Sequence, residues 1–173
     1  MINEFLELCK RRQSIRKFTA EPVPDDALKK ILEAAQTAPS AGNLQAYEIV
    51  VVKEPHTKQK LAAAALGQGF VAEAPVVLVF LALPAVSAKV YGERGAGLYS
   101  IQDATIACTY AMLAAASLNL AATWVGAFRD REVRDAVGAG GSHVPVALLP
   151  LGRAGETPRR TARRPLQNMI RMI

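Results

Sequence analysis

The residues best suited to chemistry lie near the start of the chain, in a basic window of residues 11–18. The window reads Arg11-Arg12-Gln13-Ser14-Ile15-Arg16-Lys17-Phe18. An arginine side chain is planar and always charged, so it can bind two phosphate oxygens at once, and a hydroxyl adds a further donor. The residue types therefore favour a phosphate site. The alternative is a solvated basic surface without a ligand, because short charged motifs often have no function.

A second stretch, residues 38–45, combines small, polar and turn-forming residues: Ala38-Pro39-Ser40-Ala41-Gly42-Asn43-Leu44-Gln45. Ser40, Asn43 and Gln45 supply donors and acceptors, and Gly42 lets a ligand approach the backbone closely. The alternative is an ordinary turn in which the asparagine and serine side chains hydrogen-bond the local backbone. The stretch alone leaves both interpretations open.

The composition is that of a folded domain with a basic surface. The chain has 173 residues, of which 51% are hydrophobic and 21% charged, so we expect one domain over residues 1–173. The formal net charge is +6, and much of the excess lies in residues 11–17 and 153–171. We therefore expect the two ends to converge on one anion. A nucleic-acid binder is disfavoured, because no aromatic residues are interleaved with the basic ones.

The cysteines and histidines give no sign of a metal site. Cys9 and Cys108 form no CxxC pair, and we expect two buried thiols in a reducing compartment. His56 and His143 have no metal-ligating neighbours at suitable spacing, so no metal is expected. The longest apolar run, residues 104–118, is shorter than the roughly 20 residues that a membrane-spanning helix needs. These features are typical of a soluble, cytoplasmic protein with no membrane partner.

Hydrophobic periodicity predicts the elements that position these stretches. Helices are expected at residues 3–12, 25–38, 56–66, 98–118 and 130–137, and strands at 47–53, 75–83, 121–125 and 144–151. Residues 84–97 are expected to form a loop, and residues 152–173 a basic tail. The strand at 144–151 contains Pro145 and Pro150, so we expect it near a sheet edge or ending early.

The long helix at residues 98–118 has almost no polar face after Asp103. A helix that is apolar all round must be buried all round, and a domain of this size has limited interior to surround it. This favours a second subunit covering the helix, and the alternative is a central helix wrapped by its own chain. Asp103 itself is expected to act as a helix cap or ion-pair partner rather than as a base.

Taken together, these stretches resemble the nitroreductase family of FMN-dependent oxidoreductases. The motifs that carry the resemblance are residues 12–18, residues 38–45, Glu73-Ala74-Pro75-Val76-Val77, Asp103, Thr123-Trp124-Val125-Gly126-Ala127-Phe128 and Arg163-Arg164-Pro165-Leu166. The resemblance implies an α+β fold, with a central β-sheet flanked by helices. It also implies a homodimer with a buried long helix and two FMN sites at the subunit interface.

The resemblance also implies roles for individual residues. Arg12, Ser14 and Arg16, with Gln13 between them and Arg163 from the tail, would hold the phosphate and ribityl groups of FMN. Pro39, Ser40, Ala41 and Asn43 would approach the isoalloxazine ring from the partner subunit. Gln68 would reach the ring or the ribityl chain, and Val125 and Gly126 would pass near N5, where a backbone N–H can tune the cofactor.

Four departures from the family pattern affect these expectations, and one of them is Gly152-Arg153-Ala154-Gly155 in place of a Gly-aromatic-Pro turn. Gln13 stands where the family usually has arginine or histidine, so one charge is missing at the phosphate end. Ala46-Tyr47 replaces a Pro-Trp pair beside the ring, and Asn119 replaces a glycine after the long helix.

By resemblance, NAD(P)H would reduce the flavin, which would then reduce a small organic acceptor, such as a nitroaromatic or a quinone, by a ping-pong mechanism. No catalytic residue is assigned, although Tyr47, Tyr91 and Tyr99 are conceivable proton sources. The alternative is a flavin- or nucleotide-binding protein without turnover, such as a sensor or carrier.

Overall fold

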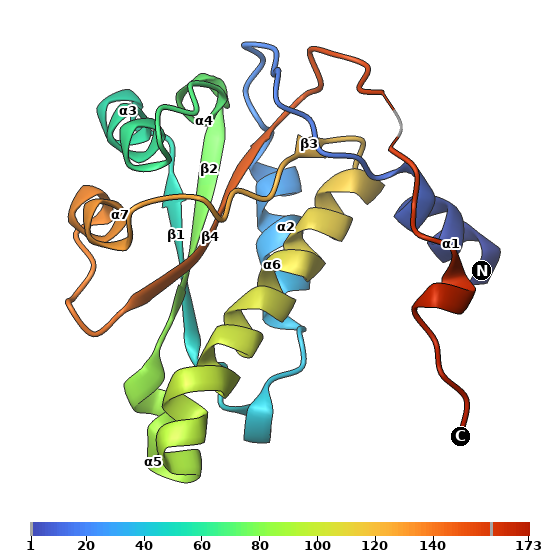
Figure 1. The fold of residues 1–173 in the computed structure, drawn as a ribbon. Coiled ribbons are helices and arrows are strands. Elements are labelled where there is room, and N and C mark those ends of the chain that lie inside the picture. Colours follow the sequence, from blue (N-terminus) through green and yellow to red (C-terminus); the bar gives the residue numbers. More distant parts are fainter. Residues whose placement is uncertain (1, 160) are drawn as a thin grey trace.

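The structure, a computed structural model, describes residues 2–159 and 161–173 and has an α+β fold (Figure 1). Its centre is a four-stranded antiparallel sheet in the order β1-β2-β4-β3. The strands are β1 (Tyr47–Val52), β2 (Val76–Ala82), β3 (Ala121–Ala122) and β4 (Val144–Gly152). The α-helices are α1 (Ile2–Arg11), α2 (Asp25–Gln36), α3 (Pro55–Ala64), α4 (Phe70–Glu73), α5 (Pro84–Arg94), α6 (Ser100–Ser117) and α7 (Asp130–Val137). A π-helix (Gly95–Tyr99) joins α5 to α6, and short 3-10 turns lie at Ala41–Asn43 and Leu166–Asn168.

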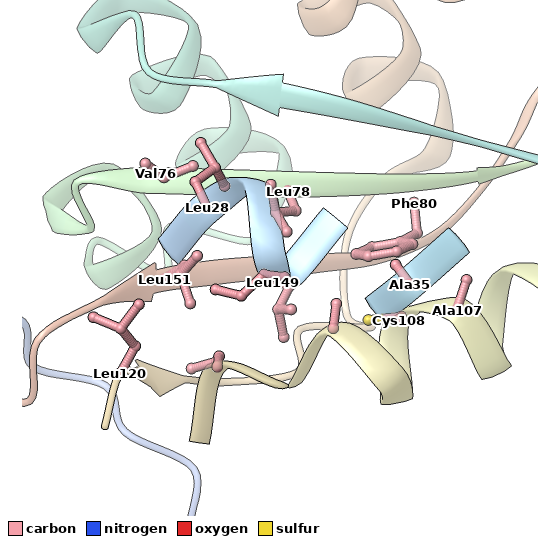
Figure 2. Packing of buried hydrophobic residues seen from close by; sticks show 14 of the residues in the cluster. Leu28, Ala35, Val76, Leu78, Phe80, Ala107, Cys108, Leu120, Leu149 and Leu151 are labelled. Carbon is pink, nitrogen blue, oxygen red and sulfur yellow. The ribbon is translucent and has the colours of Figure 1, made fainter. Parts of the chain in front are cut away.

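Helices cover both faces of the sheet, α2 and α6 on one and α3, α4 and α7 on the other (Figure 1). Strand β2 is buried along its whole length, as the unbroken apolar run predicts. Its side chains alternate, so that Leu78 and Phe80 pack toward α2 and α6 (Figure 2). Val77 and Val79 pack toward α3 and α7 on the other face. The sheet is therefore the rigid layer from which both sets of helices are positioned.

Strand β4 lies next to the sheet edge, as predicted, but is not itself the edge strand, because it pairs with β2 on one side and with the two-residue strand β3 on the other. A register shift in β2 between Phe80 and Leu81 accommodates the Pro145 end of the strand. The carbonyl of Pro150 accepts a hydrogen bond from the Thr123 N–H at 3.4 Å. The N–H and C=O of one residue in an antiparallel strand point to the same side. The hydrogen bond that Pro150 cannot donate is therefore missing on the side of the short strand β3, not on the side of β2.

The prediction of a loop at residues 84–97 is also wrong, because α5 and the π-helix occupy this region. Pro84 lies in the first turn of α5, where a proline is well tolerated because its N–H would have no intrahelical partner. The glycines at 92, 95 and 97 suggest a loop by composition. Two of them instead shape the helical backbone, since Gly92 has φ 56° and Gly95 lies against the Ser87 carbonyl.

Helix α6 is apolar, but one chain buries only part of it. Ala104, Ala107, Cys108 and Ala111 are fully buried against the core, whereas the opposite face, which carries Tyr110, remains partly exposed. That a second subunit covers this face stays a prediction. No helix in residues 2–159 and 161–173 is both long and apolar enough to cross a membrane.

The cysteine expectation is half wrong. Cys108 is buried in α6, where burial raises the pKa of its thiol well above the usual value. Cys9 is exposed on α1, which has no buried residue along its whole length and packs against α6. Both thiols are free.

Candidate functional site

The basic window leaves α1 as an extended segment that is fixed on both edges. On one edge Ser14 forms a parallel bridge with Ala122 of β3, and the Ile15 N–H donates to the Ala122 carbonyl at 3.3 Å. On the other edge the window meets the segment that follows β4. The sheet therefore fixes the backbone of the window through β3.

The second edge of the window pairs with residues 153–156. The Thr19 N–H donates to the Arg153 carbonyl at 3.1 Å, and the Gly155 N–H donates to the Lys17 carbonyl at 2.8 Å. The Arg16 N–H then donates to the Glu156 carboxylate at 2.6 Å, which ends the ladder. The predicted convergence of the two ends is therefore found for residues 153–156.

A cavity of about 490 Å³ lies beside the window. Arg11, Arg12 and Gln13 line it together with Met112 and Ala116 of α6, and the Arg11 and Arg12 guanidinium groups donate to the Ala116 carbonyl at 3.3 Å and to Met112 Sδ at 4.0 Å. Thr157 and Pro158 add a wall from the segment that follows β4. Ile15, 7% exposed, also lines the cavity, whereas its neighbours Ser14 and Arg16, which the alternation of an extended chain turns the other way, do not line it.

One carboxylate, that of Glu156, lies against the window, where it accepts the Arg16 backbone N–H but forms no ion pair with the side-chain cations that the structure describes there. Within the described residues, Arg11, Arg12, Arg16 and Lys17 make no ion pair, although Arg153 close by pairs with Glu21 at 2.7 Å. Uncompensated positive charge beside a cavity attracts an anion and raises its local concentration. This arrangement supports the phosphate interpretation over a solvated basic surface.

The structure does not extend this arrangement to Arg163. Its guanidinium hydrogen-bonds the Thr161 hydroxyl of its own segment at 3.4 Å. A role for Arg163 at the phosphate therefore stays a prediction.

The second predicted stretch, residues 38–45, and Ala46 directly after it form a loop that Asp103 holds from inside the protein. The Asp103 carboxylate, 1% exposed on α6, accepts the Ala41 N–H at 2.9 Å and the Ala46 N–H at 3.3 Å. Among the residues that the structure describes, it makes no helix-capping hydrogen bond and no ion pair, so the expectation of a cap or an ion-pair partner is wrong. The signal for this role was a single carboxylate in an otherwise uncharged helix.

The polar side chains of this loop are used largely within the loop itself. The Ser40 hydroxyl accepts the Gln45 N–H at 3.0 Å, and the Gln45 amide donates to Asn43 Oδ1 at 2.6 Å. Gly42 and Asn43 both have φ 57°, a left-handed conformation that glycine and asparagine tolerate best. What the loop offers outward is therefore mainly a tightly fixed backbone at Pro39–Asn43.

Gln68 and the segment at 125–126 form a third group. The Gln68 amide donates to the Ala65 carbonyl at 2.9 Å and to the Ala127 carbonyl at 3.3 Å, so it ties the end of α3 to that segment. The Val125 N–H is engaged by the Leu148 carbonyl at 2.9 Å. Of the two predicted N5 neighbours, only Gly126 has an N–H without a partner among the described residues.

Tyr47, one of the conceivable proton sources, is turned toward the core. Its hydroxyl donates to the Ala35 carbonyl of α2 at 3.1 Å. Burial, and then the negative charge of Asp103, raise the pKa of Tyr47 above its usual value. Both effects make Tyr47 a poorer proton donor.

Comparison with known proteins agrees with this geometry. The family model described as "Nitroreductase family" matches residues 9–80 and 65–153. The chain therefore belongs to the nitroreductase family, which confirms the family, the fold and the oxidoreductase class that the motifs predict.

The relatives cover different shares of the chain. It is 57% identical over 72 residues to an NADH dehydrogenase of Thermus thermophilus, a match that covers 42% of this chain and only 35% of that protein. It is 30% identical over 159 residues to a putative NADH dehydrogenase/NAD(P)H nitroreductase of Methanothermobacter thermautotrophicus, covering 90% of this chain and 80% of that protein. The structure of the NADPH:FMN oxidoreductase of Vibrio harveyi complexed with NAD+ superposes with a TM-score of 0.90 at 26% identity, covering 98% of this chain and 77% of that one.

Proposed function

We propose that the chain is an FMN-dependent oxidoreductase that uses NAD(P)H to reduce the flavin and then reduces a small organic acceptor by a ping-pong mechanism. The observation that carries the proposal is the uncompensated arginine window beside the cavity. A dianionic phosphate fits this donor set, which offers several guanidinium groups and a hydroxyl. When bound, FMN would supply hydride transfer, which no side chain of the protein performs.

Each part of the chain has a role in binding and orientation. Arg12, Ser14 and Arg16 would hold the phosphate, and Gly126 would offer its N–H to the ring. The loop at residues 39–43 would present its fixed backbone to the ring and exclude water there. Because the backbone of this loop is fixed before the ligand arrives, less entropy is lost on binding.

The same geometry supports a homodimer. Asp103, which holds the loop, and Ala116, which lines the cavity, are 13 residues apart on α6, or about 20 Å at the usual helical rise. The window and the loop of one chain therefore lie near opposite ends of this helix. A twofold-related copy packed on the exposed face of α6 would bring its loop to this window, which makes both sites complete.

The first test is FMN binding and reduction. We expect the purified protein to bind FMN, quenching its fluorescence, and NADH or NADPH to bleach the bound flavin. Arg12→Ala should weaken FMN binding about tenfold to a hundredfold, as expected for loss of a hydrogen bond to a charged group. Arg131→Ala is the matched control, because this exposed arginine lies on α7, paired with Asp135 at 3.8 Å.

Three outcomes would count against the proposal. If the protein does not bind added FMN, FMN is not its cofactor. If the Arg12→Ala and Arg131→Ala variants bind FMN with equal affinity, Arg12 does not bind the phosphate. Flavin that binds but stays oxidised with both nicotinamides would favour a sensor or carrier. The ping-pong mechanism requires parallel double-reciprocal plots when both substrates are varied.

A further inference from the structure

The segment between β2 and α6 carries a compact cluster of two tyrosines and one arginine. The rings of Tyr91 and Tyr99 meet edge to face, with centroids 5.2 Å apart and an interplanar angle of 81°. The Arg94 guanidinium lies 5.5 Å from the Tyr99 ring centroid, and its Nε donates to the Tyr99 hydroxyl at 3.0 Å. These contacts fix a charged side chain on an aromatic support.

The Arg94 charge is available to a ligand. Arg94 is exposed, and no carboxylate pairs with it in the part of the chain that the structure describes. Glu93 beside it is exposed as well and forms no ion pair with Arg94 or Lys89. Since Nε is already bonded to Tyr99, the two terminal nitrogens remain free to bind both oxygens of a carboxylate.

The backbone that carries the cluster is unusual. Gly92, between Tyr91 and Arg94, has φ 56° and ψ −141°, a region that side chains other than glycine rarely adopt. A π-helix follows directly at Gly95–Tyr99, and such helices are often found at functional sites. Gly95 packs so closely that a Cβ would lie 2.5 Å from the Ser87 carbonyl oxygen. The backbone that brings Tyr91, Arg94 and Tyr99 together therefore has a conformation of high free energy.

The cluster borders the loop at residues 39–43. The Tyr91 hydroxyl lies so close to Gly42 that a Cβ there would be 2.6 Å from the hydroxyl oxygen. The contacts run from Gly42 through Tyr91 and Tyr99 to Arg94. A ligand on the ring beside the loop would therefore meet this aromatic surface, with the arginine at its far end.

We propose that Tyr91, Tyr99 and Arg94 form the acceptor subsite, and that it selects planar aromatic acceptors carrying a carboxylate. The tyrosines would contact the ring of the acceptor and Arg94 would bind the carboxylate. The proposal rests on the proposed function, because it takes the loop to be the neighbour of the flavin. It adds a substrate class and a specificity-determining residue to that function.

The experiment compares two acceptors of nearly the same shape, 4-nitrobenzoate and the neutral 4-nitrobenzamide, on the FMN-loaded protein. We expect the wild type to have the lower KM for the anion. Arg94→Gln should raise the KM for 4-nitrobenzoate about tenfold, leaving kcat and the constants for 4-nitrobenzamide within about twofold, as loss of one charged hydrogen-bonded contact implies. Lys89→Gln is the matched control, since it removes the same charge from the exposed surface of α5 outside the cluster.

A binding measurement keeps this test independent of turnover. Benzoate, which the flavin does not reduce, should show saturation-transfer NMR contacts with the wild type and with Lys89→Gln, and should lose them with Arg94→Gln. Failure to bind or reduce FMN overturns the proposed function, whereas normal flavin reduction without benzoate contacts overturns only the subsite. An equal loss in Arg94→Gln and Lys89→Gln, or no preference for the anion in the wild type, also overturns the subsite.

Discussion

Asp103 shows how one side chain can determine the shape of a distant loop. Its carboxylate accepts N–H groups from Ala41 and Ala46, which lie 62 and 57 residues away in the sequence. Ala46 is fully buried, so its N–H has no access to water as a substitute partner. The loop conformation therefore depends on a residue that touches no ligand in the proposed mechanism.

Replacing Asp103 by asparagine should destabilise the protein and loosen this loop. An asparagine side chain has one acceptor oxygen, so it leaves one of the two N–H groups facing an NH₂ donor. A buried unsatisfied donor costs about 1–3 kcal/mol, and we expect a loss of this size in the free energy of unfolding by urea. FMN affinity should fall with it, and the Ala46 amide should exchange faster with solvent.

Asp135→Asn serves as the control, because this exposed carboxylate only pairs with Arg131 on the surface of α7. Surface pairs contribute about 0–1 kcal/mol. If both variants lose the same stability, or if Asp103→Asn keeps the exchange rate of Ala46, the carboxylate does not hold the loop.

Glu54 gives a prediction about pH. Its carboxylate precedes α3 and accepts the Thr57 N–H at 2.5 Å and the His56 N–H at 2.7 Å. Hydrogen bonding from Thr57, and then from His56, lowers the pKa of Glu54 from 4.5 to about 2. Because the folded-state pKa is the lower one, the carboxylate stabilises the fold above pH 4.5 and loses this effect as the pH falls toward about 2.

Urea unfolding of the wild type and of Glu54→Ala at a series of pH values tests this. The difference in stability should be constant above about pH 5 and shrink steadily as the pH falls toward 2. A difference that does not change across this range would show that the capping carboxylate is not responsible.

The sequence predicts elements well where local pattern determines them. Strand β2 follows from an unbroken apolar run, and α2 begins at Asp25 with acidic residues in its first turn as expected. Helix α5 was missed because composition cannot distinguish a glycine that breaks a helix from one that a close contact requires. At Gly95 that contact is with the carbonyl of Ser87, which only the folded chain reveals.

The candidate site also has parts that the sequence predicts and parts that it does not. The arginine window was predictable because charge and hydroxyl chemistry are visible in the residue types. The roles of Asp103 and Gln68 were not, because each bonds backbone groups that only the tertiary fold brings to it. The same holds for Asn119, whose φ of 57° shows that asparagine adopts the left-handed conformation expected of the glycine it replaces.

Two glycines of one helical segment should respond oppositely to the same substitution. At Gly95 an alanine Cβ would lie 2.5 Å from the Ser87 carbonyl oxygen, so α5 must shift. We expect Gly95→Ala to lower the free energy of unfolding by about 1–3 kcal/mol, as for overpacking. At Gly97 a Cβ meets nothing within 4 Å, so Gly97→Ala should be neutral or stabilising by up to about 1 kcal/mol.

Thermal or urea unfolding of the two variants provides the measurement, with each glycine as the control for the other. Similar losses at both positions would mean that helix flexibility, rather than the contact with Ser87, requires these glycines.

At the scale of the whole molecule, α6 separates the two halves of the proposed site. The arginine window lies near its C-terminal end and the loop at residues 39–46 near its N-terminal end (Figure 1). The outward face of α6, with Thr109 and Leu113 at helical spacing, is incompletely buried, and the helix carries no charge after Asp103. A twofold-related copy on this face would pair each window with the loop of the other subunit.

Subunit mixing distinguishes a shared site from a site within one chain. One parent carries Arg12→Ala with Arg16→Ala and so lacks a functional window. The other carries Gly42→Val, which forces a β-branched residue into a left-handed backbone beside Tyr91 and so lacks a functional loop. Neither parent dimer should retain FMN, because each of its sites lacks one half.

In a hybrid dimer the intact window of one subunit meets the intact loop of the other, so one of the two sites is complete. Hybrids purified through two different affinity tags should therefore retain one FMN per two chains, measured by flavin absorbance against protein concentration. If window and loop of the same chain formed each site, both sites of the hybrid would be defective and no flavin would be retained. Such a result would contradict the shared site, and with it the reason for placing a second copy on the exposed face of α6.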